Sequence, residues 1–286
     1  MAHVISTINL KGGVGKTTVT VGLAEMLSVE FRKKVLVIDL DPQTNATTVL
    51  IGEDKWRELN DANHTIATLF TDALAGDEAA PQFDLEKTLQ RNASPIGEVK
   101  KVDLLPSSLD LIDVQDRLGS LSSGRFYSRT PTTLLRRAVK PILDDYDFVL
   151  IDCPPNLGIV TWNGLSLSDG YIIPTIPDIL STYGIPQIQT RVKAFAADAD
   201  TTIAELGIVV SKYREASTVH RTTVERLEDD PDLPPVFETR IPEGNAYAAG
   251  VEFTKRSTLR QKYGYQGGYE VFRALAREVI DAVEEL

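Results

Sequence analysis

Residues 12–18 are Gly12-Gly13-Val14-Gly15-Lys16-Thr17-Thr18, and this run decides the fold because of its neighbours on either side. The run before it, His3–Asn9, is apolar and predicts a buried strand, and the run after it, Lys16–Glu30, has the spacing of a helix. Glycines let successive N–H groups point at one oxyanion, and a helix N-terminus adds further donors. Strand, loop and helix in this order predict a phosphate-binding loop, with Lys16 on the β- and γ-phosphates and the Thr17 hydroxyl on Mg²⁺.

Short apolar runs alternate with longer helical stretches along the rest of the chain. This alternation is typical of a sheet with crossover helices, and runs rich in Val, Ile and Leu are typical of parallel strands buried on both faces. We therefore expect one α/β domain over residues 1–286, doubly wound, with a mostly parallel twisted sheet of seven or eight strands and helices on both faces. The expected strands are His3–Asn9, Val35–Asp39, Val102–Pro106, Phe148–Asp152, Gly170–Ile176, Gly207–Ser211 and Val236–Ile241.

Five segments have the clearest helical pattern: Lys16–Glu30, Pro131–Asp144, Thr182–Ala197, Ser217–Glu228 and Gly268–Glu285. In the last of these, apolar side chains recur at three- and four-residue spacing, which predicts an amphipathic helix. Residues 52–101 are polar and only patchily helical, and we interpret them as an irregular excursion from the sheet. Residues 240–286 form the expected C-terminal helical part.

Composition excludes several classes of protein. The chain of 286 residues has 30 basic and 41 acidic side chains, a formal net charge of −11, so nucleic acid is not expected to coat its whole surface. One cysteine excludes a disulfide framework, a Cys-rich zinc site and a four-thiolate cluster within one chain. No stretch approaches the roughly 20 apolar residues that span a bilayer, and the first ten residues do not resemble a signal peptide. We therefore expect a cytoplasmic protein.

Three acidic residues follow or end predicted strands. Asp39 and Asp41 lie two positions apart, which puts both carboxylates on the same side of an extended chain, and Asp152 ends another apolar strand. Ligands of doubly wound folds bind at this carboxyl edge. One of the first two can hold Mg²⁺ or its water shell while the other orients water, and Asp152 would hold Mg²⁺ through water. The alternative is that these acids solvate strand ends or cap helices.

Lys11 places a second lysine at the front of the loop, and residues 11–18 resemble the deviant Walker A box of the ParA/MinD family of ATPases. Residues 35–43, Val-Leu-Val-Ile-Asp-Leu-Asp-Pro-Gln, resemble the second acidic box of the family. Residues 149–155, Val-Leu-Ile-Asp-Cys-Pro-Pro, resemble its Walker B strand. The resemblance covers nearly the whole chain, is weakest between about 52 and 100, and is closest to the ParA-type (Soj-like) partition ATPases.

The resemblance implies a role for each of these residues. Asp41 orients the attacking water, Asp39 lies nearer the metal shell or Lys11, and Asp152 serves Mg²⁺. Lys11 crosses a dimer interface to the phosphates of the partner's nucleotide, so that two ATP molecules lie between two subunits. ATP rather than GTP rests on the resemblance, which also puts the adenine near Tyr213 and near Pro242. We also expect slow intrinsic hydrolysis of ATP that a partner protein stimulates.

ParA-type partition ATPases bind nucleoid DNA without sequence preference as ATP dimers, and a ParB-like adaptor releases them by stimulating hydrolysis. The resemblance therefore implies a basic face on this acidic chain. Between residues 252 and 278 there are six basic and three acidic side chains, although any single one could simply belong to a solvated helix face. Glu243 stands where related proteins often have a basic residue. The candidate DNA contacts are Arg221, Arg240, Lys255, Arg256, Arg260 and Lys262.

Other functions in the same superfamily remain open or are disfavoured. A MinD-like cell-division regulator needs a basic amphipathic tail for the membrane, whereas residues 277–286 are mostly acidic on their polar side. Iron proteins of the nitrogenase type need more cysteines than Cys153. A ParA-like ATPase that positions a protein cargo, such as a carboxysome, would share the same boxes. The identity of the cargo and adaptor stays open, and a binding module without hydrolysis is disfavoured by the presence of Lys11 and Asp41.

Overall fold

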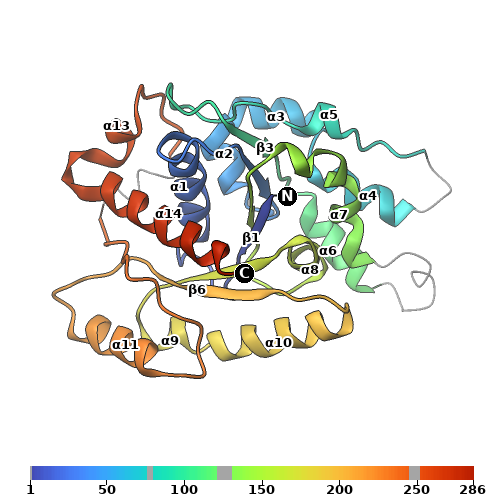
Figure 1. The fold of residues 1–286 in the computed structure, drawn as a ribbon. Coiled ribbons are helices and arrows are strands. Elements are labelled where there is room, and N and C mark those ends of the chain that lie inside the picture. Colours follow the sequence, from blue (N-terminus) through green and yellow to red (C-terminus); the bar gives the residue numbers. More distant parts are fainter. Residues whose placement is uncertain (1, 76–79, 121–130, 245–251) are drawn as a thin grey trace.

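The computed structural model describes residues 2–75, 80–120, 131–244 and 252–286 (Figure 1). These residues form a six-stranded parallel sheet in the order β3-β2-β4-β1-β5-β6. The strands are β1 His3–Thr7, β2 Val35–Asp39, β3 Val102–Leu105, β4 Phe148–Asp152, β5 Gly170–Thr175 and β6 Ala204–Val210. From β1 the chain builds one side of the sheet and then returns to add β5 and β6 on the other. This order confirms the expected doubly wound α/β fold.

Helices occupy most of the segments between the strands. Their bounds are α1 Lys16–Val29, α2 Asn45–Ile51, α3 Glu53–Asp61, α4 Ile66–Ala75, α5 Leu85–Thr88, α6 Leu111–Ser120, α7 Leu134–Val139, α8 Ile159–Leu167, α9 Ile179–Thr182, α10 Ile185–Asp198, α11 Thr218–Asp229, α13 Leu259–Tyr263 and α14 Tyr269–Glu284. Short 3₁₀ turns lie at Pro131–Thr133 and Lys140–Asp145, and a π turn lies at Gly264–Gly268.

The strand count is a correction to the expected seven or eight, because the described residues contain six. The run Val236–Ile241 contacts β6 only at its two ends: Val236 forms an isolated parallel bridge with Ile208, and the Ile241 N–H donates to the Val210 carbonyl at 2.8 Å. The run does not pair continuously, since the Thr239 N–H donates to the Glu278 carboxylate of α14 instead of to the sheet. A tertiary contact therefore interrupts a segment whose sequence is suited to a strand.

The core is divided into two clusters by the alternation of side chains along the strands. Val35 and Val37 of β2 belong to the cluster that packs against α1, α2 and α14. Leu36 and Ile38 of the same strand belong to the cluster that packs against α4, α6, α7, α8 and α10. The sheet is thus covered on both faces, and Figure 1 shows α1 and α14 side by side on one of them.

Two of the expected helices are interrupted. In the run Pro131–Asp144, α7 ends at Val139 and a 3₁₀ turn follows, because Pro141 has no N–H to continue the helical hydrogen bonds. The run Thr182–Ala197 is divided into α9 and α10, and α10 has its proline in the first turn. The excursion 52–101 contains α3, α4 and α5 and is more helical than expected, although residues 76–79 lie outside the described residues.

The contact between α1 and α14 predicts the effect of one substitution. A Cβ added at Gly22 would stand 2.5 Å from two ring carbons of Phe272, which is fully buried. We expect Gly22→Ala to lower the free energy of unfolding by up to about 2 kcal/mol, because overpacking costs about 1–3 kcal/mol and alanine favours a helix by only ~1 kcal/mol. Urea unfolding measures the change. Gly22→Ala/Phe272→Leu should recover part of the loss, and a more stable Gly22→Ala protein would contradict the prediction.

Candidate functional site

The loop between β1 and α1 lies at the carboxyl edge of the sheet. Gly13 and Gly15 have φ angles of 74° and 89°, in the left-handed region that favours glycine. Val14 between them is buried, and its carbonyl accepts a hydrogen bond of 2.7 Å from the Ser211 hydroxyl just after β6. Gly12 and Gly13 are exposed. The loop is therefore anchored through Val14 and presents its glycine backbone outward, as an oxyanion cradle requires.

Lys16, the first residue of α1, folds back beneath the loop. Its Nζ donates to the carbonyl oxygens of Lys11 at 3.1 Å and Asn9 at 3.4 Å, and the residue is 6% exposed. Burial lowers its pKa, and the charges of Asp152 and Asp41 oppose this shift. The ammonium group is held by loop carbonyls and lies among acidic groups, so it can reach an anion bound in the loop.

Thr17 and Asp152 join α1 to the end of β4. The Thr17 hydroxyl donates to Oδ2 of Asp152 at 2.7 Å, and Asp152 is fully buried. Its other oxygen, Oδ1, has no hydrogen-bond partner among the described residues. Burial raises the pKa of Asp152 to about 7, although the Thr17 hydrogen bond opposes the shift. A buried carboxylate oxygen without a donor, beside a hydroxyl, is a donor set that suits Mg²⁺.

Asp41 follows β2 and faces the same group of charges. It is 7% exposed, its Oδ1 accepts the Gln43 N–H at 2.9 Å, and its carbonyl accepts the Ser107 hydroxyl at 2.7 Å. Burial raises its pKa, while the Gln43 N–H and the charge of Lys16 lower it. The structure thus brings Asp41, Lys16 and Asp152 together, as the sequence predicted.

Asp39 has a different environment from Asp41 and Asp152. Its Oδ2 accepts both the N–H and the hydroxyl of Thr47, at 2.8 and 2.7 Å, and its Oδ1 accepts the N–H of Asp41 at 3.0 Å. The residue is fully buried, and burial raises its pKa well above the usual range. Because both oxygens hold the turn into α2, Asp39 positions Asp41 in this structure, and its place in the metal shell remains a prediction.

Lys11 and Thr18 occupy the two ends of the loop, and both are half-buried. The Lys11 N–H donates to Oδ1 of Asn9 at 2.9 Å, and the Asn9 amide donates to the Pro174 carbonyl at 2.8 Å. The ion pairs among the described residues do not include Lys11. Asn9 thus braces the loop, a role not predicted from the sequence, although a polar amide at the end of an apolar strand was a usable signal.

Comparison with known proteins decides the family. A family model described as an AAA domain matches residues 2–204. An uncharacterised protein of Mycobacterium tuberculosis is 34% identical over 98% of this chain and 79% of its own. The sporulation initiation inhibitor protein Soj of Bacillus subtilis is 28% identical over 98% of both chains. The chain belongs to the ParA/MinD family. Chromosome partitioning proteins named ParA, such as that of Caulobacter vibrioides at 28% identity, also match over nearly the whole chain.

Solved structures share the ParA/MinD fold of this chain. The apo McdA of Cyanothece is 20% identical with a TM-score of 0.76 and covers 99% of this chain and 100% of its own. A cobyrinic acid a,c-diamide synthase of Mycobacterium smegmatis, solved with an ATP analogue and magnesium, is 24% identical with a TM-score of 0.74, over 99% and 96% of the two chains. At these identities the likeness concerns the fold.

The two segments that the resemblance assigns to the base lie together. Tyr213 and Pro242 form an isolated parallel bridge, and the Tyr213 N–H donates to the Ile241 carbonyl at 2.9 Å. The Tyr213 hydroxyl accepts from Arg240 at 3.3 Å, and the Arg240 guanidinium lies over its ring. Tyr213 therefore has packing partners of its own, and its contact with a base remains a prediction.

The candidate DNA contacts of this ParA/MinD chain have unequal surroundings. Arg240 pairs with Glu228 at 2.9 Å, Arg260 pairs with Glu270 at 3.1 Å, and Arg221 donates to the Glu215 carbonyl at 2.9 Å. Lys255 and Arg256 are exposed and take part in none of the ion pairs of the described residues. They line an open hollow of about 600 Å³ with Ser257 and Gln261.

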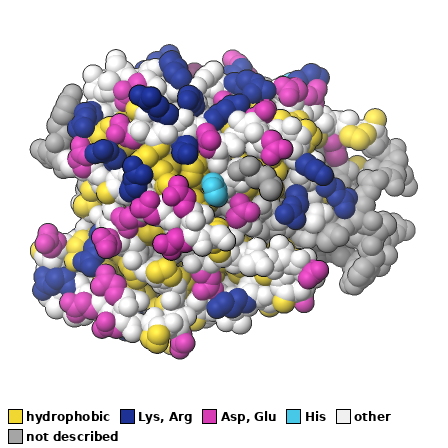
Figure 2. Space-filling view, viewed as in Figure 1, with side chains coloured by type: hydrophobic (Ala, Val, Ile, Leu, Met, Phe, Trp, Pro, Cys, Tyr) yellow, Lys and Arg dark blue, Asp and Glu magenta, His cyan; other side chains and the backbone are white. Residues whose placement is uncertain are grey.

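Figure 2 shows one face of the molecule, on which Lys and Arg side chains are frequent in the upper half, where Figure 1 places α13, α2 and α3. Residues 245–251, which fall within the predicted C-terminal part, lie outside the described residues. Within the ranges that the structure describes, none of the helices is both long and apolar enough to span a membrane.

Lys262 requires a correction. Its side chain is 4% exposed and is paired at 2.9 Å with Glu25 of α1, which is fully buried. A lysine that is buried against a carboxylate cannot reach a DNA backbone, so Lys262 is removed from the DNA contacts. The sequence showed a basic residue in a basic stretch, but only the fold brings α1 and α13 together.

The raised pKa of Asp152 predicts a dependence on pH in the metal-free protein. Burial raises the pKa of its carboxyl group to about 7, against an ordinary value near 3.8, so the folded state binds the proton more tightly. Stability therefore falls as the pH rises through the window from about 4 to about 7. Asp152→Asn keeps an oxygen acceptor for Thr17 and removes the charge.

In EDTA and without nucleotide, we expect the Asp152→Asn protein to be more stable than wild type at pH 8, by up to about 4 kcal/mol. The difference should shrink toward pH 5.5. Thermal unfolding at the two pH values measures it, and Asp54→Asn, on the exposed face of α3, is the control. The same stability difference at both pH values would contradict the assignment.

Proposed function

We propose that this chain is a Mg²⁺-dependent ATPase of the ParA type with slow intrinsic turnover. The observation that carries the proposal is the meeting of Lys16, the Thr17–Asp152 pair and Asp41 beside a left-handed glycine loop at one edge of the sheet. A structural cluster would pair these charges with one another. Instead Lys16 bonds to loop carbonyls, and one oxygen of Asp152 is left without a donor in the described protein.

The chemistry follows from these contacts. The loop N–H groups and Lys16 bind the β- and γ-phosphates, and the oxygens of Thr17 and Asp152 hold Mg²⁺, which would neutralise phosphate charge. Asp41 is braced by the N–H of Gln43, and Asp39 accepts the N–H of Asp41. This bracing fixes the Asp41 carboxylate, which orients the attacking water. Tyr213 and Pro242 border the adenine.

Lys11 is the residue on which the proposed dimer depends. Its backbone is fixed by Asn9, and its side chain takes no part in the ion pairs of the described residues. We place this ammonium group on the phosphates of the ATP bound by a second copy, where it stabilises charge in the transition state. ATP thus holds two copies together, and hydrolysis separates them.

The dimer would bind double-stranded DNA without sequence preference through exposed cations, with Lys255 and Arg256 as the best-placed pair. Such binding falls steeply with salt. The chain would then act as one domain, in the cytoplasm and on the nucleoid, in plasmid or chromosome partition, with a ParB-like adaptor that stimulates hydrolysis. Positioning of a protein cargo would use the same cycle with another adaptor, and identification of the adaptor bound by the ATP-loaded protein separates the two uses.

Light scattering and DNA retention test the proposal. Wild type is measured with ATP, with ADP and without nucleotide, each at low and high salt. We expect a doubling of mass and retention of unrelated DNA sequences with ATP alone, and loss of retention at high salt. A mass that does not respond to ATP would overturn the dimer, and retention that does not change with salt would overturn the phosphate-backbone contact. No turnover with DNA and every adaptor tried would leave a nucleotide-binding protein, not an enzyme.

A further inference from the structure

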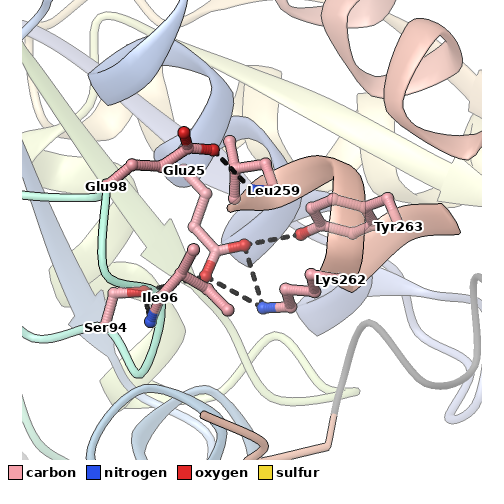
Figure 3. Close-up of polar contacts among 7 residues, drawn as sticks. All are labelled: Glu25, Ser94, Ile96, Glu98, Leu259, Lys262 and Tyr263. Carbon is pink, nitrogen blue, oxygen red and sulfur yellow. Dashed lines mark hydrogen bonds and ion pairs between the residues drawn. The ribbon is translucent and has the colours of Figure 1, made fainter. Parts of the chain in front are cut away.

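A buried cluster joins the phosphate-loop helix to the C-terminal part (Figure 3). Glu25 of α1 is fully buried, and its two carboxylate oxygens accept from Nζ of Lys262 at 2.9 Å each. The Tyr263 hydroxyl donates to the same carboxylate at 2.7 Å and the Ser94 hydroxyl at 3.1 Å. Burial beside this carboxylate raises the pKa of Tyr263 well above its usual range. The Glu25 cluster is these four residues: Glu25, Ser94, Lys262 and Tyr263.

A second set of contacts holds the same segment from its other side. Gly97 and Glu98 donate their N–H groups to the carbonyls of Arg256 and Ser257, at 2.8 and 3.1 Å. The Glu98 carboxylate accepts the N–H of Leu259, the first residue of α13 (Figure 3). The exposed side chains of Lys255 and Arg256 therefore project from a backbone that is fixed to the loop 94–98 and, through α13, to Glu25.

Glu25 also connects this segment to the phosphate loop. It stands nine residues after Lys16 on one continuous helix, a separation of about 13–14 Å along the axis. Both residues belong to one hydrogen-bonded helix, so we expect a displacement of α1 at the loop to move Glu25 and with it Lys262. Among the described residues, Lys16, Thr17 and Asp152 form no hydrogen bond to the Glu25 cluster, so the connection runs through the helix itself.

We propose that Glu25 is a positioning residue for the DNA-binding surface, because its buried ion pair with Lys262 fixes Lys255, Arg256 and α13 to the phosphate-loop helix. The proposal rests on the DNA binding proposed above and adds a requirement to it. The affinity for DNA depends on a carboxylate that DNA never touches. The cations contact the backbone productively only while the segment 255–263 is held on α1.

The variants that test the role of Glu25 are chosen from the known energetics of buried ion pairs. Removal of one partner leaves the other buried and uncompensated, whereas replacement of both by uncharged groups of similar volume is often tolerated. Glu25→Gln and Lys262→Met should each release the segment, and Glu25→Gln/Lys262→Met should restore its packing. Glu30→Gln is the matched control. It removes the same charge from the end of the same helix, where Glu30 is partly exposed and pairs with Arg273 at 3.1 Å.

Glu25→Gln and Glu30→Gln change the net charge equally, so a difference in their affinity for DNA reports the lost contact and not the lost charge. Loss of one negative charge, taken alone, tightens DNA binding, and Glu30→Gln should show this small gain. Glu25→Gln should instead weaken binding of the ATP-loaded protein about tenfold at one fixed salt concentration, equivalent to ~1.4 kcal/mol. The affinity of Glu25→Gln for a fluorescent ATP analogue should stay within about twofold of wild type. The double variant should bind the ATP analogue equally well, and its affinity for DNA should recover.

Hydrogen exchange of the DNA-free protein supplies a readout that is independent of DNA. Amides of residues 255–263 should exchange faster in Glu25→Gln than in Glu30→Gln, with no change in residues 12–18. Tyr263→Phe keeps the ion pair and removes one hydrogen bond. It should weaken DNA binding and speed the exchange of residues 255–263 by about two- to threefold each. This milder variant decides the matter if Glu25→Gln does not fold.

The outcomes separate the two proposals. If wild type with ATP does not retain DNA, the proposed function fails, and faster exchange at 255–263 would still support the Glu25 cluster as a clamp. If wild type retains DNA while Glu25→Gln and Tyr263→Phe match Glu30→Gln in affinity and exchange, the role of Glu25 is wrong and the proposed function stands.

Discussion

Lys11→Ala is expected to abolish ATP-dependent dimerisation and to lower the partner-stimulated turnover about 10³-fold, the scale of a cation supplied to the transferred phosphoryl group in trans. The backbone of Lys11 is already held by Asn9, and Lys16 bonds to its carbonyl, not its side chain. The substitution therefore removes the ammonium group while the loop keeps its shape. Light scattering with ATP and single-turnover hydrolysis measure the two effects.

The control for Lys11→Ala is Lys193→Ala, which removes an exposed lysine of α10 that pairs with Glu205 at 3.2 Å. It should dimerise and turn over as wild type does. Binding of a fluorescent ATP analogue to the Lys11→Ala monomer should weaken by less than about tenfold, because the nucleotide keeps the contacts of its own loop. A Lys11→Ala protein that dimerises with ATP as readily as wild type would exclude the sandwich arrangement.

Asp41→Ala is expected to lower turnover about 100-fold or more while the ATP-bound dimer still forms and stays on DNA. Asp41 follows β2 beside Lys16 and Asp152, and within the part of the chain that the structure describes its carboxylate accepts the Gln43 N–H at 2.9 Å. Loss of this carboxylate removes the group proposed to orient water but none of the groups proposed to bind phosphate. DNA retention with ATP over time should become persistent.

Asp39→Asn is the informative companion to Asp41→Ala, because the two acids are two residues apart and have different contacts. The carboxylate of Asp39 holds Thr47 and the N–H of Asp41, so its loss should reduce stability together with turnover. Asp41→Ala should leave the unfolding midpoint close to that of wild type. If Asp41→Ala fails to dimerise at all, its carboxylate belongs to the interface and not to the water-orienting step.

Local patterns were sufficient for the phosphate loop and for most of the sheet. A run such as Gly12–Thr18 between an apolar strand and a helix has few other structures available, since its glycines, lysine and threonine each meet a local requirement. β2 and β4 have the predicted bounds because buried parallel strands are continuous apolar runs. The family resemblance identified the two acidic boxes in their order along the chain. The structure then placed Asp41 and Asp152 at the same edge of the sheet.

Residues whose role depends on a distant partner were harder to predict. Lys262 has the same residue type and the same basic neighbourhood as Lys255, yet one is buried against Glu25 and the other is exposed. Thr239 lies in a run suited to a strand but bonds to Glu278, 39 residues away. Ser211 braces Val14 across 197 residues. The partners in each pair are too far apart in the sequence for a local hydrophobic pattern to predict their contact.

By itself, the sequence determined the doubly wound class, the phosphate loop and the acids at its edge, because these depend on propensity, glycine conformation and hydrophobic period within short windows. Only the tertiary structure decided that Asp39 braces a turn, that six strands pair and that Lys262 is buried against Glu25 of α1. Those outcomes depend on which surfaces the chain packs together, and burial changes a charged side chain from a surface contact into an internal counter-ion.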